Sequence, residues 1–167
     1  VLGAEGQRSL LHEADEIVAG RVRLFGGEPV ELNLTPPAPL FHWTEYETGR
    51  ARMDGDIKLI WEPARFGWAT VLARAYFVTG REKYAESFWN YFVTFLAANP
   101  PFQGPNWISP QEAALRIITW TFCLHLLREA DSTSESRVRA LGEAIAVHAE
   151  RIPSTLIYAR SQNNNHL

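Results

Sequence analysis

A helical period dominates the chain from residue 56 to residue 151, and it constrains the fold more than any other feature. Apolar residues recur there at spacings of three and four, which is the pattern of helices with one buried face. Breaks fall at Gly80, at Asn99-Pro100-Pro101 and at Ser132-Thr133-Ser134, whose residue types end one helix or start the next. Four successive helices predict an all-α body.

The first two helices can be placed from the residues at their ends. Asp56 is a good N-cap for a helix over 57–78. Pro63 interrupts the first turns of that helix, which allows 59–63 to form a separate turn before the main helix begins. A second helix is predicted over 82–97.

The third helix is preceded by Ser109, with Pro110 at its first position and Glu112 at its third, which is the arrangement of a capping box. The third and fourth helices are expected over about 110–129 and 132–151. The four helices make two successive hairpins that begin 53 residues apart and share no sequence motif. Stacked hairpins form a solenoid or, with enough curvature, a closed ring.

The part of the chain before these helices is less regular. An amphipathic helix is predicted over 7–19, and alternating apolar residues around Gly26-Gly27 predict a short β-hairpin within 21–34. The prolines of 35–39 exclude a helix there. A long loop therefore leads to the helical body, and its aromatic rings, His42-Trp43 among them, favour a lid or rim that lies against the body.

Charge and cysteine content exclude several classes of protein. The formal net charge is -3 without a long run of one sign, so the chain lacks the basic surface that binds nucleic acid. Cys123 is the only cysteine and is expected in the core, which excludes an internal disulfide. No spacing of ligand residues predicts a metal site, and no cofactor is predicted. Apolar runs end well short of the roughly 20 residues that cross a bilayer, so no membrane span is predicted.

Trp61, Glu62 and Arg65 lie within one turn at the start of the helical body. An indole face beside charged groups suits the binding of a sugar, by ring stacking and by charge-assisted hydrogen bonds. The same spacing is also that of an ion pair between Glu62 and Arg65 beside a core tryptophan. Both interpretations stay open at this point.

A second group of candidates surrounds the predicted start of the third helix. Asn106 and Trp107 precede this helix, and Glu112 and Arg116 lie four residues apart within it. Loops at helix starts concentrate functional groups, so substrate binding is one interpretation. The other is a tryptophan that plugs the core and an i,i+4 salt bridge on the surface. Two further candidate binding residues lie in the long loop, His42 and Trp43.

Asn163-Asn164-Asn165-His166 is the most unusual stretch of the chain. Amides offer donors and acceptors, and an imidazole titrates near neutral pH. A lyase that acts on a uronic acid removes a proton next to a charged carboxylate. Donors that neutralise this carboxylate lower the barrier, and a His or Tyr takes the proton. A polar loop or a boundary of the cloned sequence is the alternative. Structural roles are expected for the other helical histidines, His12, His125 and His148.

Four motifs, taken in order, resemble the N-terminal toroid domain of the heparinase II/III family of polysaccharide lyases. They are DIKLIWEPARF, AYFVTGREKYAESF, NPPFQGPNWISPQEAALRIITW and the terminal SQNNNHL. The resemblance implies a lead-in helix and hairpin over 1–40 and the N-terminal part of an (α/α) toroid over 41–167. The rest of the toroid and a C-terminal β-sandwich would then be absent.

The resemblance also implies an activity, the β-elimination of uronic-acid-containing polysaccharide. By match to the family, Asn165 or Asn164 would neutralise the carboxylate, and His166 could act as base. The Tyr and second His that the family supplies from later in its chain have no counterpart here, so this chain alone is expected to be inactive. The positions matched to the sugar groove are Trp61, Glu62, Arg65, Asn106, Trp107, Glu112 and Arg116.

The protein expected from this resemblance is a fragment of a bacterial lyase that is periplasmic or secreted. Its partners would be an acidic polysaccharide, such as a glycosaminoglycan, alginate or an exopolysaccharide, and the missing C-terminal part of its own polypeptide. A non-catalytic carbohydrate-binding or structural toroid domain is the alternative. A glycoside hydrolase on the same scaffold would need two carboxylates across the groove, for which Glu62 and Glu112 are the only attractive pair.

Overall fold

The computed structural model describes residues 3–156 and is mostly helical. The α-helices in that range are α1 (Ala4–Val18), α2 (Trp43–Glu47), α3 (Lys58–Ala64), α4 (Ala69–Thr79), α5 (Glu82–Ala98), α6 (Pro110–Leu127) and α7 (Glu135–Arg151). The short elements are the 3-10 helices η1 (Pro105–Trp107) and η2 (Pro153–Thr155) and the antiparallel strands β1 (Arg21–Arg23) and β2 (Pro29–Glu31). The predicted helical body with a small N-terminal β-hairpin is confirmed. Within 3–156, no helix combines the length and apolar character needed to cross a membrane.

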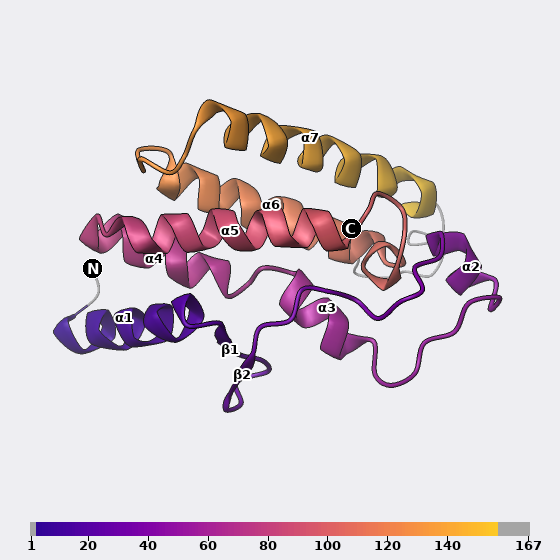
Figure 1. Ribbon diagram of the computed structural model, residues 1–167, viewed down its shortest axis with the longest axis horizontal. Coiled ribbons are helices and arrows are strands. Elements are labelled where there is room, and N and C mark those ends of the chain that lie inside the picture. The colour runs from indigo at the N-terminus through magenta and orange to yellow at the C-terminus, as the bar shows by residue number, and fades with distance from the viewer. Residues whose placement is uncertain (1–2, 157–167) are drawn as a thin grey trace.

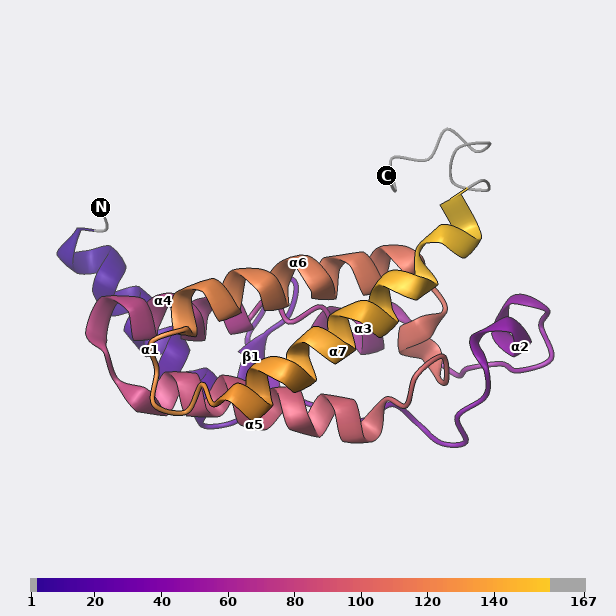
Figure 2. The same ribbon diagram turned by 90° about the horizontal axis from the view of Figure 1, so that it is seen from above.

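Two antiparallel hairpins, α4/α5 and α6/α7, form the body (Figure 1). α4 is central, because it packs against α1, α5 and α6, while α7 packs against α6. α4 and α6 run in one direction, and α1, α5 and α7 run in the other (Figures 1 and 2). The C-terminal ends of α5 and α7 and the N-terminal end of α6 therefore lie at one end of the stack. We call this end, with α2, α3 and the loop 99–109, the loop end.

The core between α4, α5 and α6 is rich in aromatic rings. Trp120 of α6 has no exposed surface, and its ring centre lies 5.5 Å from Phe66, 5.2 Å from Phe92 and 5.8 Å from Phe95. Edge-to-face contacts of this kind add to the stabilisation from burial. Cys123, one turn further along α6, is fully buried as predicted, and burial raises the pKa of its thiol.

The break between α3 and α4 lies after Pro63. The predicted first piece near Pro63 exists, but it is a helix of seven residues that contains the proline, and the Asp56 carboxylate accepts a bond from its first N–H. The chain turns after Ala64, where Phe66 has a φ of 61°. Left-handed backbone is unfavourable for a bulky residue. The fully buried Phe66 ring, 5.3 Å from that of Phe95, offsets this cost and fixes the turn.

The two helices of the second hairpin begin differently. The predicted helix start at Ser132-Thr133-Ser134 is confirmed, and Ser134 caps α7, since its hydroxyl accepts a hydrogen bond from the N–H of Arg137. Ser109 precedes α6 but makes no side-chain cap bond, and the Glu112 carboxylate binds Arg65 instead of returning to Ser109. The predicted capping box is therefore wrong, because a tertiary ion pair takes its carboxylate.

Candidate functional site

The long loop before α3 lies against the loop between α5 and α6. The N–H of Trp43 donates to the carbonyl of Phe102 at 2.9 Å, and the N–H of Gly104 donates to that of Phe41 at 2.7 Å. Gly104 has a φ of 85°, and a Cβ there would lie 3.1 Å from the side chain of Leu40. Only glycine suits both the backbone and this approach. The predicted contact of the long loop with the body is confirmed, although the loop also contains the short helix α2.

Arg65 is the centre of the partly exposed region of the loop end. Its Nε and Nη2 donate to the two carboxylate oxygens of Glu112 at 2.7 Å each, and its Nη1 donates to Glu62 at 2.5 Å. The hydrogen bonds to Glu112 are the main reason that the pKa of Arg65 is raised. The side chain is 32% exposed for Arg65 and 29% for Glu62, but only 2% for Glu112. The predicted Glu62–Arg65 pair is confirmed. The surface salt bridge considered for Glu112 and Arg116 is not formed, because Glu112 is buried and pairs across to α3.

The loop that carries η1 is held from both sides by side chains. From α3, the Trp61 indole N–H donates to the carbonyl of Pro105 at 2.9 Å. From α6, Nη2 of Arg116 donates to the carbonyl of Asn106 at 2.5 Å. The Asn106 amide in turn donates to the side-chain oxygen of Asn99 at 2.8 Å. The loop is therefore fixed relative to α3, α5 and α6.

Arg116 is a buried cation with few partners. Its side chain has no exposed surface, and its Nε and Nη1 make no hydrogen bond with any residue that the structure describes. Burial lowers its pKa to about 9, which leaves it charged at neutral pH, and the charge of Glu112 opposes this shift. The guanidinium carbon lies 5.5 Å from the ring centre of Phe95. The favourable cation–π geometry compensates only in part for the unpaired N–H groups.

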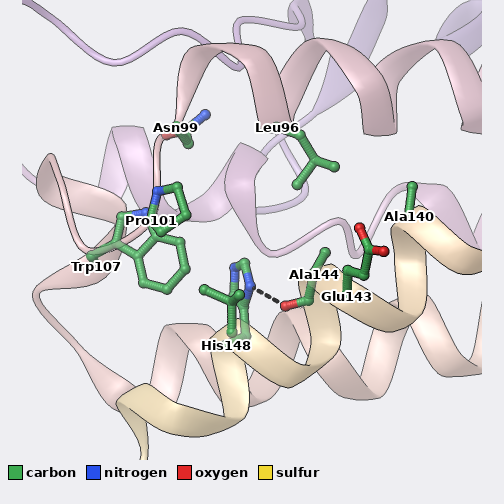
Figure 3. Close-up of a pocket in the computed structure, with 9 residues that line it drawn as sticks. Leu96, Asn99, Pro101, Trp107, Ala140, Glu143, Ala144 and His148 are labelled. Atoms are coloured by element: carbon green, nitrogen blue, oxygen red, sulfur yellow. Dashed lines mark hydrogen bonds between the residues drawn. The ribbon is translucent and has the colours of Figure 1, made fainter.

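His148, for which the sequence predicts only a structural role, adjoins this region from α7. It is 1% exposed, and its ring centre lies 4.4 Å from that of Trp107 and 4.8 Å from that of Trp120. Its Nδ1 bonds the carbonyl of Ala144 at 2.8 Å, as Figure 3 shows, and its Nε2 has no partner. Burial and then the charge of Arg116 lower the pKa of His148 to about 3. The imidazole is therefore neutral at physiological pH.

A cavity of about 250 Å³ opens beside His148, between α5 and α7 (Figure 3). Leu96 and Pro101 line one side of it, and Ala144 and Val147 line the other. The walls are mostly hydrocarbon and include no cation. This cavity does not suit an acidic sugar. Hollows at the other end of α6 and α7 contain Arg128 or Arg139, and the surface around Arg65 is the candidate site at the loop end.

Arg151, at the end of α7, contacts both α2 and the loop 99–109. Its Nε donates to the carbonyl of Trp107 at 2.8 Å, and its Nη2 donates to that of Ile108 at 2.5 Å. Its guanidinium carbon lies 3.7 Å from the ring centre of Trp43, and Glu47 lies 3.7 Å away. Arg151 was not among the residues predicted to form a site. The only available signal was a basic residue in the last turn of a helix, which is common.

The predicted site residues fall into three groups. Those with exposed surface are His42, Trp43, Trp61, Glu62 and Arg65. Those that expose 1% or less are Asn106, Trp107, Glu112 and Arg116, so their contribution to a ligand site at the loop end is to position its neighbours. The predicted catalytic residues Asn164, Asn165 and His166 lie outside the described residues.

The chain matches no known protein family, no curated protein and no solved structure. The resemblance to the heparinase II/III family therefore rests on the four motifs alone. Within residues 3–156, no group of three or more His, Cys, Asp or Glu side chains has the arrangement of a metal site.

Proposed function

We propose that the chain is the N-terminal part of a polysaccharide lyase with an (α/α) toroid of the heparinase II/III type, and that its loop end binds the acidic sugar. The observation that carries this proposal is the placement of Arg65 one helical turn after Trp61, with both side chains partly exposed. The partly exposed Arg65 guanidinium offers the planar fork that recognises a carboxylate. In the structure Glu112 occupies its Nε and Nη2 and Glu62 its Nη1, so a ligand carboxylate would take the place of one of them. An indole beside it offers a face on which a sugar ring can stack.

The lyase step is proposed for the residues that follow η2. α7 ends at the loop end, and the residues proposed for this step, 164–166, lie outside the described residues. The amide of Asn164 or Asn165 would neutralise the uronate carboxylate, and His166 would remove the proton at C5. The electron pair of that C–H bond forms the C4–C5 double bond as the C4–O bond breaks, and the leaving oxygen takes a proton.

The full protein in this proposal completes the toroid with further helices and adds a β-sandwich. It would be periplasmic or secreted, and its substrate would be a glycosaminoglycan, alginate or an exopolysaccharide. The stack of two antiparallel hairpins, in which α4 and α6 run parallel, supports an (α/α) scaffold.

A second function, a carbohydrate-binding domain without catalysis, is favoured by the burial of four candidate residues. In that case Asn106, Trp107, Glu112 and Arg116 stabilise the loop end, and only the surface around Arg65 meets the sugar. A glycoside hydrolase is less well supported. It would need Glu62 or Glu112 as a protonated acid, and both are hydrogen-bonded to the Arg65 guanidinium.

The test is calorimetric binding of oligogalacturonate, oligoglucuronate and oligomannuronate to the 167-residue chain. Arg65→Met is expected to weaken binding roughly tenfold or more, as for loss of a charge-assisted hydrogen bond. Arg8→Met, an exposed position on α1 far from the loop end, should change the affinity less than about twofold.

Ultraviolet absorbance of the unsaturated product then separates the two functions. The lyase proposal expects turnover by the longer natural protein and none by this chain. Binding by that longer protein without product would select the non-catalytic function. Failure of the chain to bind any of the three acidic oligosaccharides would contradict the proposed site.

A further inference from the structure

Within residues 3–156, Arg116 has no carboxylate hydrogen-bond partner, although a buried guanidinium usually has one. Its side chain is fully buried, and Nη2 bonds a backbone carbonyl while Nε and Nη1 bond none of the described residues. Removal of a charge from water is unfavourable unless paired groups replace the lost hydration. His148, the titratable group packed nearby from α7, is neutral and supplies no negative charge. The Nε and Nη1 groups of Arg116 can therefore still donate hydrogen bonds to a further acceptor.

Glu112 is placed to supply that interaction. It lies one turn before Arg116 on α6, and residues four apart lie on the same face of a helix. Both side chains are buried, and the charge of Glu112 already acts on Arg116. In the structure the carboxylate binds Arg65 on α3. A change of the Glu112 side-chain rotamer would carry the carboxylate from one arginine toward the other without a change in the helix backbone.

We propose that Glu112 is a two-position carboxylate, which pairs with Arg65 when the loop end is empty and with Arg116 when an acidic ligand holds Arg65. The ligand carboxylate takes over the Nε and Nη2 hydrogen bonds of Arg65, and Glu112 takes up the unpartnered N–H groups of Arg116. Hydrogen bonds are exchanged, and no bond or proton is transferred. Arg116 also bonds the carbonyl of Asn106, so the exchange connects the ligand to the loop that carries η1.

The ligand in this inference rests on the proposed function, whereas the exchange itself concerns only residues of the chain. It can therefore be tested without a sugar. Arg65→Met removes the surface partner and should send Glu112 to Arg116. A double-mutant cycle of Glu112→Gln and Arg116→Met measures the coupling between these two residues. This coupling is expressed as a factor in the unfolding equilibrium constant. We expect that factor to be about tenfold larger when Arg65 is replaced by Met than when Arg65 is present. Equal couplings in the two backgrounds would overturn the proposal.

A native-state measurement covers the case in which a doubly substituted variant does not fold. The Nε–Hε signal of Arg116 in a ¹⁵N spectrum, assigned with Arg116→Lys, reports hydrogen bonding at the guanidinium. It should move in Arg65→Met and stay in place in the control Arg8→Met. If Arg65→Met is itself unfolded, Arg65→Lys, which keeps the charge but loses the bidentate fork, serves in its place. An unchanged Arg116 signal in the folded variant would contradict the exchange.

Titration with oligogalacturonate then separates the two proposals. Binding that moves the Arg116 signal in the same direction as Arg65→Met supports both. Absence of binding, with the signal still moving in Arg65→Met, leaves the exchange supported and rejects the acidic ligand. Binding without movement of the Arg116 signal keeps the proposed function and rejects the exchange.

Discussion

In the core between α4, α5 and α6, Trp120 packs among phenylalanine rings, whereas at the loop end Arg116 and Arg151 donate to the carbonyls of loop residues. The side chains of Trp120, Arg116 and Arg151 are all buried. The core is stabilised by apolar area and ring packing, which depend on volume and shape. The loop end is stabilised by specific donors, which depend on the position of single atoms.

This difference indicates what each region is built for. Apolar packing fixes the helices, and a polar cluster with unpaired donors would be a poor way to gain stability. The polar cluster of the loop end does, however, hold three distant segments of the chain in one arrangement. These segments are the long loop, α3 and the loop of η1. Rigid placement of loops is what a binding surface needs. Substitutions in the two regions should therefore fail in different ways.

The largest loss of stability is expected in the core. Trp120→Ala removes a fully buried indole from four aromatic contacts and should lower the free energy of unfolding by about 3–5 kcal/mol, measured by urea denaturation. Phe77→Ala on α4 is the control, because the Phe77 side chain is 70% exposed, and its cost should stay below about 0.5 kcal/mol. Similar losses for the two would show that the core is wrongly placed.

At the loop end, Arg151→Met should lower the free energy of unfolding by about 2–3 kcal/mol, because the carbonyls of Trp107 and Ile108 lose a charged donor. Arg139→Met is the matched control on α7. Its exposed pair with Glu135 should contribute less than about 0.5 kcal/mol. Equal effects of the two substitutions in urea denaturation would remove the assigned role of Arg151.

The pH dependence of stability tests the contact between the two regions at His148. Its pKa is lowered to about 3 in the folded state, so below about pH 6.5 the unfolded chain binds a proton that the folded chain does not. Stability is therefore lost as the pH falls through this window, by about 1–2 kcal/mol at pH 5 from this group. His148→Leu should remove that part of the pH dependence, whereas His125→Gln, on an exposed position of α6, should retain the wild-type profile. An unaltered profile in His148→Leu would mean that the folded protein accommodates the charged imidazole.

The smallest effect concerns the serines that precede the two helices of the second hairpin. Ser134→Ala should lower the free energy of unfolding by about 1 kcal/mol, because the hydroxyl accepts the N–H of Arg137. Ser109→Ala should cost only a few tenths of that, since this hydroxyl makes no cap bond to α6. Thermal unfolding of the two variants, compared side by side, distinguishes them. A larger loss of stability for Ser109→Ala than for Ser134→Ala would show that Ser109 caps α6 after all.

Local sequence signals predicted the helices well and the loop end poorly. The bounds of α5, α6 and α7 agree with the predicted helices to within about three residues, because glycine, proline and serine mark their ends. The Glu62–Arg65 pair was also predictable, since its members lie three residues apart. The second partner of Arg65 was not. Glu112 lies 47 residues further along the chain, and its spacing from Arg116 pointed to a different pair.

The structural role predicted for His148 agrees with its burial, but the contacts of His148 and Arg151 could not be predicted, for a related reason. Each looks like an ordinary polar residue near the end of an amphipathic helix, and only the packing of α7 against the loop end gives it its contacts. The break at Phe66 likewise depends on a ring contact with Phe95, from another helix. Tertiary contacts of this kind are invisible to local periodicity.

In the proposed function, an acidic sugar binds at the loop end and not at the core. Each of the six tryptophans gives one indole N–H signal in a ¹⁵N spectrum, so the two regions can be observed in a single titration with oligogalacturonate. The signals of Trp61 and Trp43, at the loop end, should move with saturating behaviour, while those of the fully buried Trp120 and Trp89 should stay in place. Movement of the Trp120 signal without that of Trp61, or no movement of any signal at high sugar concentration, would contradict the claim.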